Sequence, residues 1–261
     1  MNLISEIVSS KRRRVDQAKR LVPLEQMRAL ASEARESAQT PALRKALSAE
    51  SKINIIAEFK RRSPSKGEIR PDADPLIIAR AYESAGASAV SVLTEEDYFG
   101  GSLDDLRAVR ETISVPILRK DFIFDEYQVY ESAAAGADAL LLIVAALDDE
   151  ALVRLRRIAE DELGMDALVE VHTPDEMKRA TACDAKIIGV NNRDLQTFTV
   201  SLETSVQLAP MASKGSVLIS ESGIASAADI RRLRSVGYRA FLIGESLMRA
   251  DDPGELLRSF L

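Results

Sequence analysis

The sequence predicts an α/β fold, a single (β/α)₈ TIM barrel with an N-terminal helical extension. Eight apolar strand candidates recur at intervals of roughly 20 to 35 residues, which fits strand–helix units whose parallel strands are buried on both faces. The segments between them have helical patterns, and several end at a glycine just before the next strand. A chain of 261 residues that is 46% apolar is long enough for one large core. We therefore expect a single domain, with an extension over residues 1–48 and the barrel over residues 49–261.

The extension has polar, amphipathic helical patterns, punctuated by Pro23 and Pro41. Such a segment can cap one end of a barrel or pack against its side, and the sequence leaves both possibilities open. Its basic run, residues 11–14, has no aromatic residues interleaved with it. A short run of this kind is more often a solvated helix face than a nucleic-acid patch, so we expect it to lie in solvent.

The first strand candidate ends in a charged pair. Residues 55–64 read I-I-A-E-F-K-R-R-S-P. Because side chains alternate between the two faces of a strand, Glu58 and Lys60 must point the same way. A charged pair on an inward face is costly unless it has a use, so the pattern predicts a catalytic strand end. The basic turn at residues 61–67 offers hydroxyls and positive charge to an anionic ligand.

The later units repeat one helix-to-strand junction. Gly86, Gly136 and Gly237 each end a helical pattern and suit the left-handed position beyond a helix. Residues 148–163 carry an apolar helical stripe, and residues 173–176 read as a capping box with proline at the first helical position. The strand candidates lie near residues 54–60, 88–94, 115–121, 138–145, 166–171, 186–191, 216–221 and 239–244. An open doubly wound sheet is the competing architecture, but no glycine-rich dinucleotide fingerprint follows the first strand.

Polar residues gather at the ends of these strand candidates. In a barrel the carboxyl ends of the strands meet at one rim, where active sites lie. Charged residues also end strands simply because strands end at the surface, so the joint pattern counts for more than any single residue. Burial should raise the pKa of Glu170 and lower the pKa of Lys120, which would bring both toward acid–base catalysis near neutrality. The residues at these ends are Glu58, Lys60, Lys120, Glu170, Asn191, Glu221, Ser222 and Gly244.

Two glycine-containing turns follow the last two strand candidates. Ser222-Gly223 and Gly244-Glu245 stand where many barrels bind phosphate through backbone N–H groups, although ordinary turn chemistry also explains them. The Glu245 carboxylate would repel a phosphate unless it turns away. Phe99 and Phe122 adjoin strand ends, so they are either core residues or contacts for a flat ligand.

Composition excludes several classes of function. A net charge of −6 argues against non-specific binding to nucleic acid or anionic membrane. The single cysteine, Cys183, excludes an intrachain disulfide and is expected in the core, and a single histidine makes a zinc site or a histidine triad unfavourable. His172 is therefore expected to have a loop role. No apolar run is long enough for a membrane span and the N-terminus has no signal-peptide pattern, so we expect a cytoplasmic protein. With a single histidine, catalysis is expected to use Lys, Glu and Asn.

The chain resembles the indole-3-glycerol phosphate synthase family of tryptophan biosynthesis, from about Lys11 to its C-terminus. Six motifs carry the resemblance in family order: I-I-A-E-F-K-R-R-S-P-S, P-I-L-R-K-D-F, A-L-V-E-V-H, I-G-V-N-N-R-D-L, I-S-E-S-G-I and L-I-G-E-S-L-M. The resemblance implies a carboxy-lyase that closes the ring of 1-(2-carboxyphenylamino)-1-deoxyribulose 5-phosphate with loss of CO₂ and water. It implies no metal and no organic cofactor. We expect a small phosphorylated substrate as partner, no nucleic acid, no membrane, and a monomer rather than an oligomer.

The resemblance also implies roles for named residues. Lys120 is similar to the general acid that protonates the ribulose carbonyl, and Glu170 to the acid–base group of the dehydration. Lys60 would pair with substrate anions and could share proton transfer. The supporting and substrate-binding positions are Glu58, Asn191, Arg193, Glu221, Ser222, Gly223, Gly244, Glu245, Ser63, Leu195, Leu242, Phe99 and Phe122. Unlike some family members, this chain has no aromatic residue before Phe59 with which the extension could contact the substrate's ring.

Two other functions fit the same residues. A Schiff-base lyase would use Lys120 or Lys60 as a covalent nucleophile, and trapping with borohydride would detect it. A non-catalytic protein that binds a phosphorylated ligand on a barrel is the second alternative. The combination of Lys120, Glu170 and Asn191 argues against it, because binding alone needs no acid and base at separate strand ends.

Overall fold

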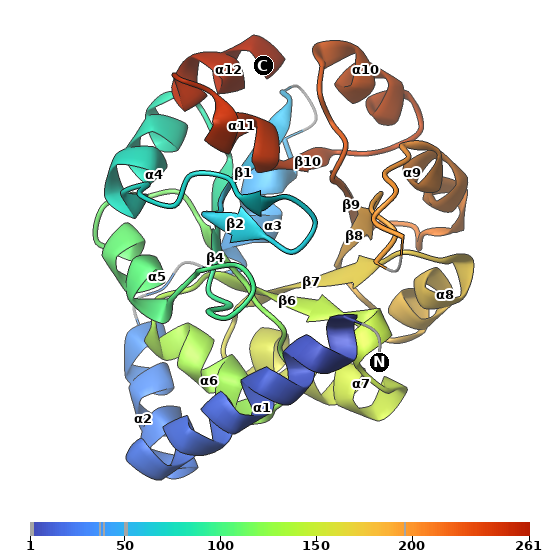
Figure 1. Ribbon diagram of the computed structural model, residues 1–261. Coiled ribbons are helices and arrows are strands. Elements are labelled where there is room, and N and C mark those ends of the chain that lie inside the picture. The colour runs from blue at the N-terminus through green and yellow to red at the C-terminus, as the bar shows by residue number, and fades with distance from the viewer. Residues whose placement is uncertain (1–2, 37, 39, 50–51, 196) are drawn as a thin grey trace.

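Eight parallel strands close into a barrel in the order β1-β10-β9-β8-β7-β6-β5-β4. This computed structural model describes residues 3–36, 38, 40–49, 52–195 and 197–261. Figure 1 shows the strands at the centre of a ring of helices, and the fold class predicted from the sequence is confirmed. The barrel strands are β1 (Asn54–Phe59), β4 (Ala89–Leu93), β5 (Ile117–Lys120), β6 (Ala139–Ile143), β7 (Asp166–Val171), β8 (Ile187–Asn191), β9 (Val217–Glu221) and β10 (Ala240–Ile243).

Helices follow the strands, as the predicted strand–helix units require. Those that surround the barrel are α4 (Pro75–Ser84), α5 (Leu103–Arg110), α6 (Glu126–Ala134), α7 (Asp149–Arg157), α8 (Pro174–Ala182), α9 (Glu203–Leu208), α10 (Ala227–Ser235), α11 (Glu245–Arg249) and α12 (Pro253–Phe260). The 3₁₀ turns η1 (Val144–Ala146) and η3 (Ala209–Met211) and the π-helical turn η2 (Ile158–Glu162) complete the ring. The predicted glycine junctions are left-handed, with φ of 99° at Gly86, 88° at Gly136 and 108° at Gly237.

Each of the eight predicted strands is present within two residues of its expected start. The strand expected from residue 115 begins at Ile117, because Pro116 lacks an N–H for the ladder. The basic turn at residues 61–67 also contains a small antiparallel pair that the sequence analysis did not predict, β2 (Arg62–Ser63) with β3 (Gly67–Glu68). The helix expected over residues 148–163 is α-helical from Asp149 to Arg157 and continues as a π-helical turn from Ile158 to Glu162.

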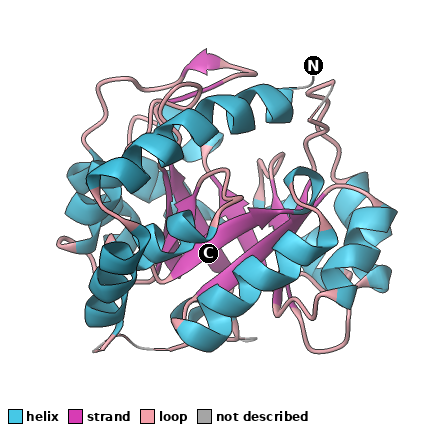
Figure 2. Ribbon diagram, turned by 90° about the horizontal axis from the view of Figure 1, so that it is seen from below, coloured by secondary structure: helices cyan, strands magenta, loops and turns pink. Residues whose placement is uncertain are grey.

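The N-terminal segment does both things that the sequence left open. Helix α1 (Leu3–Leu21) crosses one end of the barrel, as Figures 1 and 2 show, and α2 (Leu24–Arg35) packs against α6 on its side. Helix α3 (Ala42–Leu47) closes the opposite end, where Leu43 and Leu47 join the inward-facing residues of the strands in one buried cluster. Burying two leucines in this way stabilises the fold by roughly 3 to 6 kcal/mol. The division into an extension over residues 1–48 and a barrel over 49–261 stays a prediction.

Candidate active site

A cavity of about 660 Å³ lies at the carboxyl ends of the strands. All sixteen residues selected from the sequence line it, so chain topology brings together side chains from distant parts of the sequence. The cavity is also lined by residues that the sequence analysis did not select, including Leu3, Ile4 and Ile7 of α1, and Lys66 and Asp121. The roles of all these residues remain predictions.

Lys120 is the central cation of the cavity. Its Nζ lies 2.7 Å from Glu170 Oε2 and 3.2 Å from Glu221 Oε2, with the three side chains on β5, β7 and β9. Only 12% of the Lys120 side chain is exposed, and the two carboxylates are 3% and 2% exposed. One ammonium group thus links three strand ends in a site largely shielded from water.

The charges of this trio differ from the expectation based on burial alone. Burial by itself would lower the pKa of Lys120, but Glu170, Glu221 and Glu58 raise it well above its usual range. Burial likewise opposes ionisation of Glu170, yet Lys120 and His172 lower its pKa well below its usual range. The prediction that desolvation would move both groups toward neutrality is therefore wrong, because opposite charges outweigh it.

Glu221 is the carboxyl group of this trio whose pKa lies near neutrality. Burial and the neighbouring Glu170 raise the pKa of Glu221 to about 7, although Lys120 opposes this effect. Two carboxylates cannot both be stably ionised so close together when one cation serves them. In the resting site the Lys120 ammonium and the Glu170 carboxylate are the charged pair, and Glu221 is the group that titrates near neutrality.

Glu58 and Lys60 form the pair predicted from strand alternation. Lys60 Nζ donates to Glu58 Oε1 over 2.5 Å, and both side chains face the cavity. Two glycines of neighbouring strands make room for the carboxylates. A Cβ added to Gly244 would collide with Glu58, and one added to Gly189 would collide with Glu221. Both glycines are therefore required by the space that the carboxylates occupy.

Asn191 connects the acid–base groups to the next loop. Its Nδ2 donates to Glu170 Oε1 over 3.3 Å, and its Oδ1 accepts from the backbone N–H of Arg193 over 3.0 Å. The amide is thus held from both ends. This arrangement fixes the orientation of Glu170 from the β8 side.

The predicted phosphate-binding region lies on the β9 and β10 side of the cavity. Ser222 and Gly223 are left-handed, with φ of 66° and 80°, and Ser63 lines the same cavity. The Glu245 carboxylate is held by cations, with Lys66 at 3.8 Å, Arg193 at 3.6 Å and Arg249 at 3.4 Å. Its charge is therefore compensated by these cations, so repulsion of an anion is reduced.

The other wall of the cavity is apolar. The rings of Phe99 and Phe122 lie 6.2 Å apart between centroids at an interplanar angle of 39°, which is a tilted aromatic pair. Leu195 and Leu242 line the cavity with them. From α1 the cavity receives only aliphatic side chains among the described residues: Leu3, Ile4 and Ile7.

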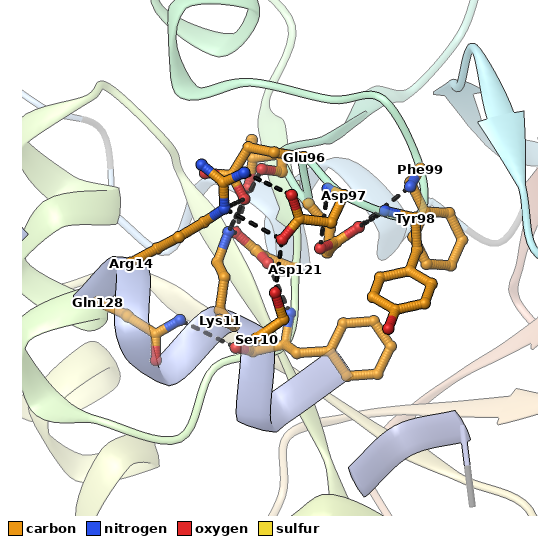
Figure 3. Close-up of polar contacts among 12 residues, drawn as sticks. Ser10, Lys11, Arg14, Glu96, Asp97, Tyr98, Phe99, Asp121 and Gln128 are labelled. Atoms are coloured by element: carbon orange, nitrogen blue, oxygen red, sulfur yellow. Dashed lines mark hydrogen bonds and ion pairs between the residues drawn. The ribbon is translucent and has the colours of Figure 1, made fainter. Parts of the chain in front are cut away.

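Helix α1 is fixed over the cavity by charged contacts (Figure 3). Lys11 Nζ lies 2.8 Å from Glu96 Oε2 and 2.8 Å from Asp121 Oδ2, next to the strand residue Lys120. Ser10 Oγ and Arg14 Nε both donate to Asp97 Oδ2, over 2.6 and 3.1 Å. The prediction that residues 11–14 form a solvated face is wrong for Lys11, whose side chain is 4% exposed, because α1 turns it toward the barrel.

Sequence reasoning also missed His172. A loop role is expected from its position before the capping box, but its Nε2 lies 3.3 Å from Glu170 Oε1 and its side chain is 9% exposed. The predicted capping box is incomplete because Glu176 bonds to His172. Thr173 accepts from the Glu176 N–H, but the Glu176 carboxylate accepts from the His172 N–H instead of completing the box. The signal was available, since His172 stands two residues after Glu170, as Lys60 does after Glu58.

Neither a metal cluster nor a membrane-spanning helix occurs in the described part of the chain. No three His, Cys, Asp or Glu side chains among the described residues are grouped so that they could hold a metal ion. Among the same residues, no helix has the length and apolar character needed to cross a membrane. Cys183 is buried, as expected.

Comparisons with known proteins agree with the fold and with the sequence motifs. A family model described as indole-3-glycerol phosphate synthase matches residues 4–260, a longer match than the motifs suggested. A protein named indole-3-glycerol phosphate synthase from Carboxydothermus hydrogenoformans is 47% identical over 262 residues, covering 99% of both chains. One of the same name from Bacteroides thetaiotaomicron is 46% identical over 260 residues, covering 100% of this chain and 98% of the relative.

Among solved structures, 3-hexulose-6-phosphate synthase from Salmonella typhimurium superposes with a TM-score of 0.65. The match covers 80% of this chain and 96% of that one at 14% identity. Thiamine phosphate pyrophosphorylase from Pyrococcus furiosus gives a TM-score of 0.61, covering 84% and 95% at 15% identity. At such identities the likeness shows the barrel fold alone.

Proposed function

The chain belongs to the indole-3-glycerol phosphate synthase family, and on that premise we propose which side chains carry the reaction. It is an enzyme with indole-3-glycerol phosphate synthase activity in tryptophan biosynthesis, and it acts on a small phosphorylated substrate. The substrate's benzene ring carbon, which bears the carboxylate, must form a bond to the ribulose carbonyl carbon. The ring then loses CO₂, and the new hydroxyl leaves as water.

Lys120 is the general acid of ring closure in this proposal. Its ammonium group, with its raised pKa, is protonated at rest and lies in the cavity between Glu170 and Glu221. As the ring carbon attacks, negative charge develops on the carbonyl oxygen, and a proton from Lys120 neutralises it. The electron pair of the carbon–carboxylate bond then returns to the ring as CO₂ departs.

Glu170 is the acid–base group of the dehydration. While Lys120 is charged, Glu170 remains an ionised carboxylate. Once Lys120 has given up its proton, burial acts on Glu170 with less opposition and its pKa rises. Glu170 can then accept a proton from the substrate and return one to the leaving hydroxyl. Proton transfer at Lys120 thereby prepares Glu170 for the next step.

The remaining cavity residues bind and orient the substrate. Backbone N–H groups of Gly223, Gly244 and Glu245, with Ser222 and Ser63, would hold the phosphate. Lys60, positioned by Glu58, would pair with a substrate anion, and Arg193 would hold the substrate from another part of the cavity wall. The apolar wall would enclose the aromatic ring, and it consists of Phe99, Phe122, Leu195, Leu242 and the α1 residues Ile4 and Ile7.

We also propose that the enzyme is a carboxy-lyase that acts as a monomer in the cytoplasm, without metal or organic cofactor. The acid–base residues alone can carry each step described above, which supports the proposal. Gel filtration with light scattering would test the monomer. Activity assays after exhaustive chelation would test whether the reaction needs a metal ion.

One observation carries the assignment of roles, namely the buried contact of Lys120 with Glu170 and Glu221. The test follows indole fluorescence after addition of 1-(2-carboxyphenylamino)-1-deoxyribulose 5-phosphate to wild type, Lys120→Ala and Glu170→Gln. We expect kcat to fall by roughly 10² to 10⁴ in both variants. Lys178→Ala, which removes an exposed lysine of α8, is the matched control and should leave kcat unchanged.

Other outcomes point to the alternatives. Borohydride trapping of substrate on Lys120 or Lys60 would establish a Schiff-base mechanism instead. Substrate that binds to wild type without any growth of indole fluorescence would support a non-catalytic binding protein. Full activity in Lys120→Ala would remove Lys120 from the role of general acid.

A further inference from the structure

His172 lies between two carboxylates at the end of β7. Its Nε2 is 3.3 Å from Glu170 Oε1, and its Nδ1 is 3.1 Å from Glu176 Oε2. The His172 backbone N–H donates to the same Glu176 oxygen over 2.7 Å, which fixes the ring relative to α8. With 9% of its side chain exposed, the ring is almost enclosed. Both ring nitrogens therefore face an acceptor.

This arrangement favours the doubly protonated ring. A neutral imidazole has only one N–H, so one of its nitrogens would face a carboxylate without a proton. Burial alone would lower the pKa of His172, but the neighbouring Glu170 and Glu176 carboxylates raise it to about 10. The ring is therefore an imidazolium through the neutral range. It supplies Glu170 with a second cation at Oε1, whereas Lys120 contacts Oε2.

We propose that His172 is a positioning residue for Glu170, a role that rests on the acid–base function proposed for Glu170. Nε2 makes no hydrogen bond with good alignment among the described residues, so at rest its link to Glu170 is a charge contact. When Lys120 gives its proton to the substrate, Glu170 loses its nearest cation. His172 remains charged and retains part of the electrostatic stabilisation that keeps Glu170 ionised and ready to accept a proton.

The pH dependence of Glu170 follows from the groups that surround it. Lys120 faces it from β5, Asn191 from β8, Glu221 from β9 and His172 from its own strand end. Glu58 of β1 acts on Lys120 and Glu221. His172 itself is faced by Glu170 and Glu176, and Arg193 and Asp194 line the hollow outside it.

Three variants separate charge from packing. His172→Leu removes both the charge and the donor, and we expect kcat to fall by roughly 10-fold or more with a much smaller change in KM. His172→Asn keeps a polar side chain but also lacks the charge, so a role that depends on charge predicts that kcat falls in this variant too. Because a cation near Glu170 is gone, its pKa rises, so the acidic limb of kcat should move to higher pH in His172→Asn. A role in packing alone would not move the pH profile.

Glu176→Gln provides the third test. With one carboxylate removed, the pKa of His172 falls, and a basic limb should enter the pH profile at a lower pH than in wild type. Asp175→Asn is the matched control, because it makes the same change one residue earlier on α8 at an exposed side chain. It should leave the profile unchanged.

An NMR titration gives a readout independent of activity. His172 is the single histidine of the chain, so its ring resonances are assigned without ambiguity. We expect no titration of the ring below about pH 9, against about 6.5 for an ordinary histidine. Titration near 6.5, or a His172→Leu variant that folds and keeps the wild-type kcat and pH profile, would overturn the proposal.

The two levels of inference fail in different ways. If Glu170→Gln keeps its activity, the proposed role of Glu170 is wrong and the role of His172 fails with it. If Glu170→Gln is inactive while the His172 variants behave as wild type, the inference about His172 alone is wrong.

Discussion

Replacing Lys11 by methionine removes a buried cation from between two carboxylates while keeping a side chain of similar length. Breaking a buried ion pair by removing one partner costs about 3 to 5 kcal/mol. Here the low end applies, because Asp121 keeps Arg119 at 3.0 Å and the Thr94 hydroxyl at 2.6 Å. Glu96 is 32% exposed, so water can solvate it again. We expect the free energy of unfolding to fall by about 3 kcal/mol, which leaves a domain of ordinary stability folded.

The matched control is Lys19→Met on the same helix. Lys19 lies 2.7 Å from Asp125, but the two side chains are 35% and 25% exposed, so the loss should stay below about 1 kcal/mol. Both variants are unfolded with guanidinium chloride and followed by far-ultraviolet circular dichroism, since the chain has no tryptophan. Lys11→Met should also raise KM, because Ile4 and Ile7 of α1 line the cavity. Equal losses in the two variants would refute the reasoning, because burial would then not decide the value of the pair.

Two further predictions concern the carboxylate of Glu221. Gly189→Ala places a methyl group where Glu221 Oε1 lies, so kcat should fall by roughly 10-fold or more as Glu221 moves away from Lys120, whereas Gly254→Ala in α12 should retain wild-type kcat. Because the pKa of Glu221 is raised from 4.5 to about 7, its stabilising contribution is complete below pH 4.5 and is lost as the pH rises through 7. Glutamine does not titrate, so the free energy of unfolding of Glu221→Gln, taken relative to wild type, should rise by at most about 3 kcal/mol between pH 4.5 and pH 8. Urea unfolding of both proteins at both pH values measures this difference. A difference that stays constant with pH would contradict the assignment.

Strand alternation was the most productive sequence signal. It placed Glu58 and Lys60 on one face, and the structure joins them over 2.5 Å. The same rule applied to residues 170 and 172 would have found the ring beside Glu170. The capping-box pattern instead predicts a local partner for Glu176, but the Glu176 carboxylate accepts from His172, because local capping competes with other donors within reach.

The sequence could not reveal contacts that depend on distant segments. Lys11 looks solvated in its local pattern, and its partners Glu96 and Asp121 become visible only when α1 is placed across the barrel. The directions predicted for the pKa shifts of Lys120 and Glu170 are wrong for a related reason. Desolvation can be inferred from an apolar run, but the outcome for Lys120 depends on how many carboxylates converge on it, and three do.

The order of the chain has a consequence for how the enzyme is made. The partners of α1 at Asp97 and Asp125 follow their contacts in α1 by 83 and 106 residues. Glu170, Asn191 and Glu221 come later still, and barrel closure waits for β10 to pair with β1. A ribosome therefore completes these partners of α1 before it reaches Glu170, Asn191 and Glu221. The order of synthesis allows α1 to dock on β4 and β5 first, so that the later strands complete the catalytic centre beneath a helix already in place.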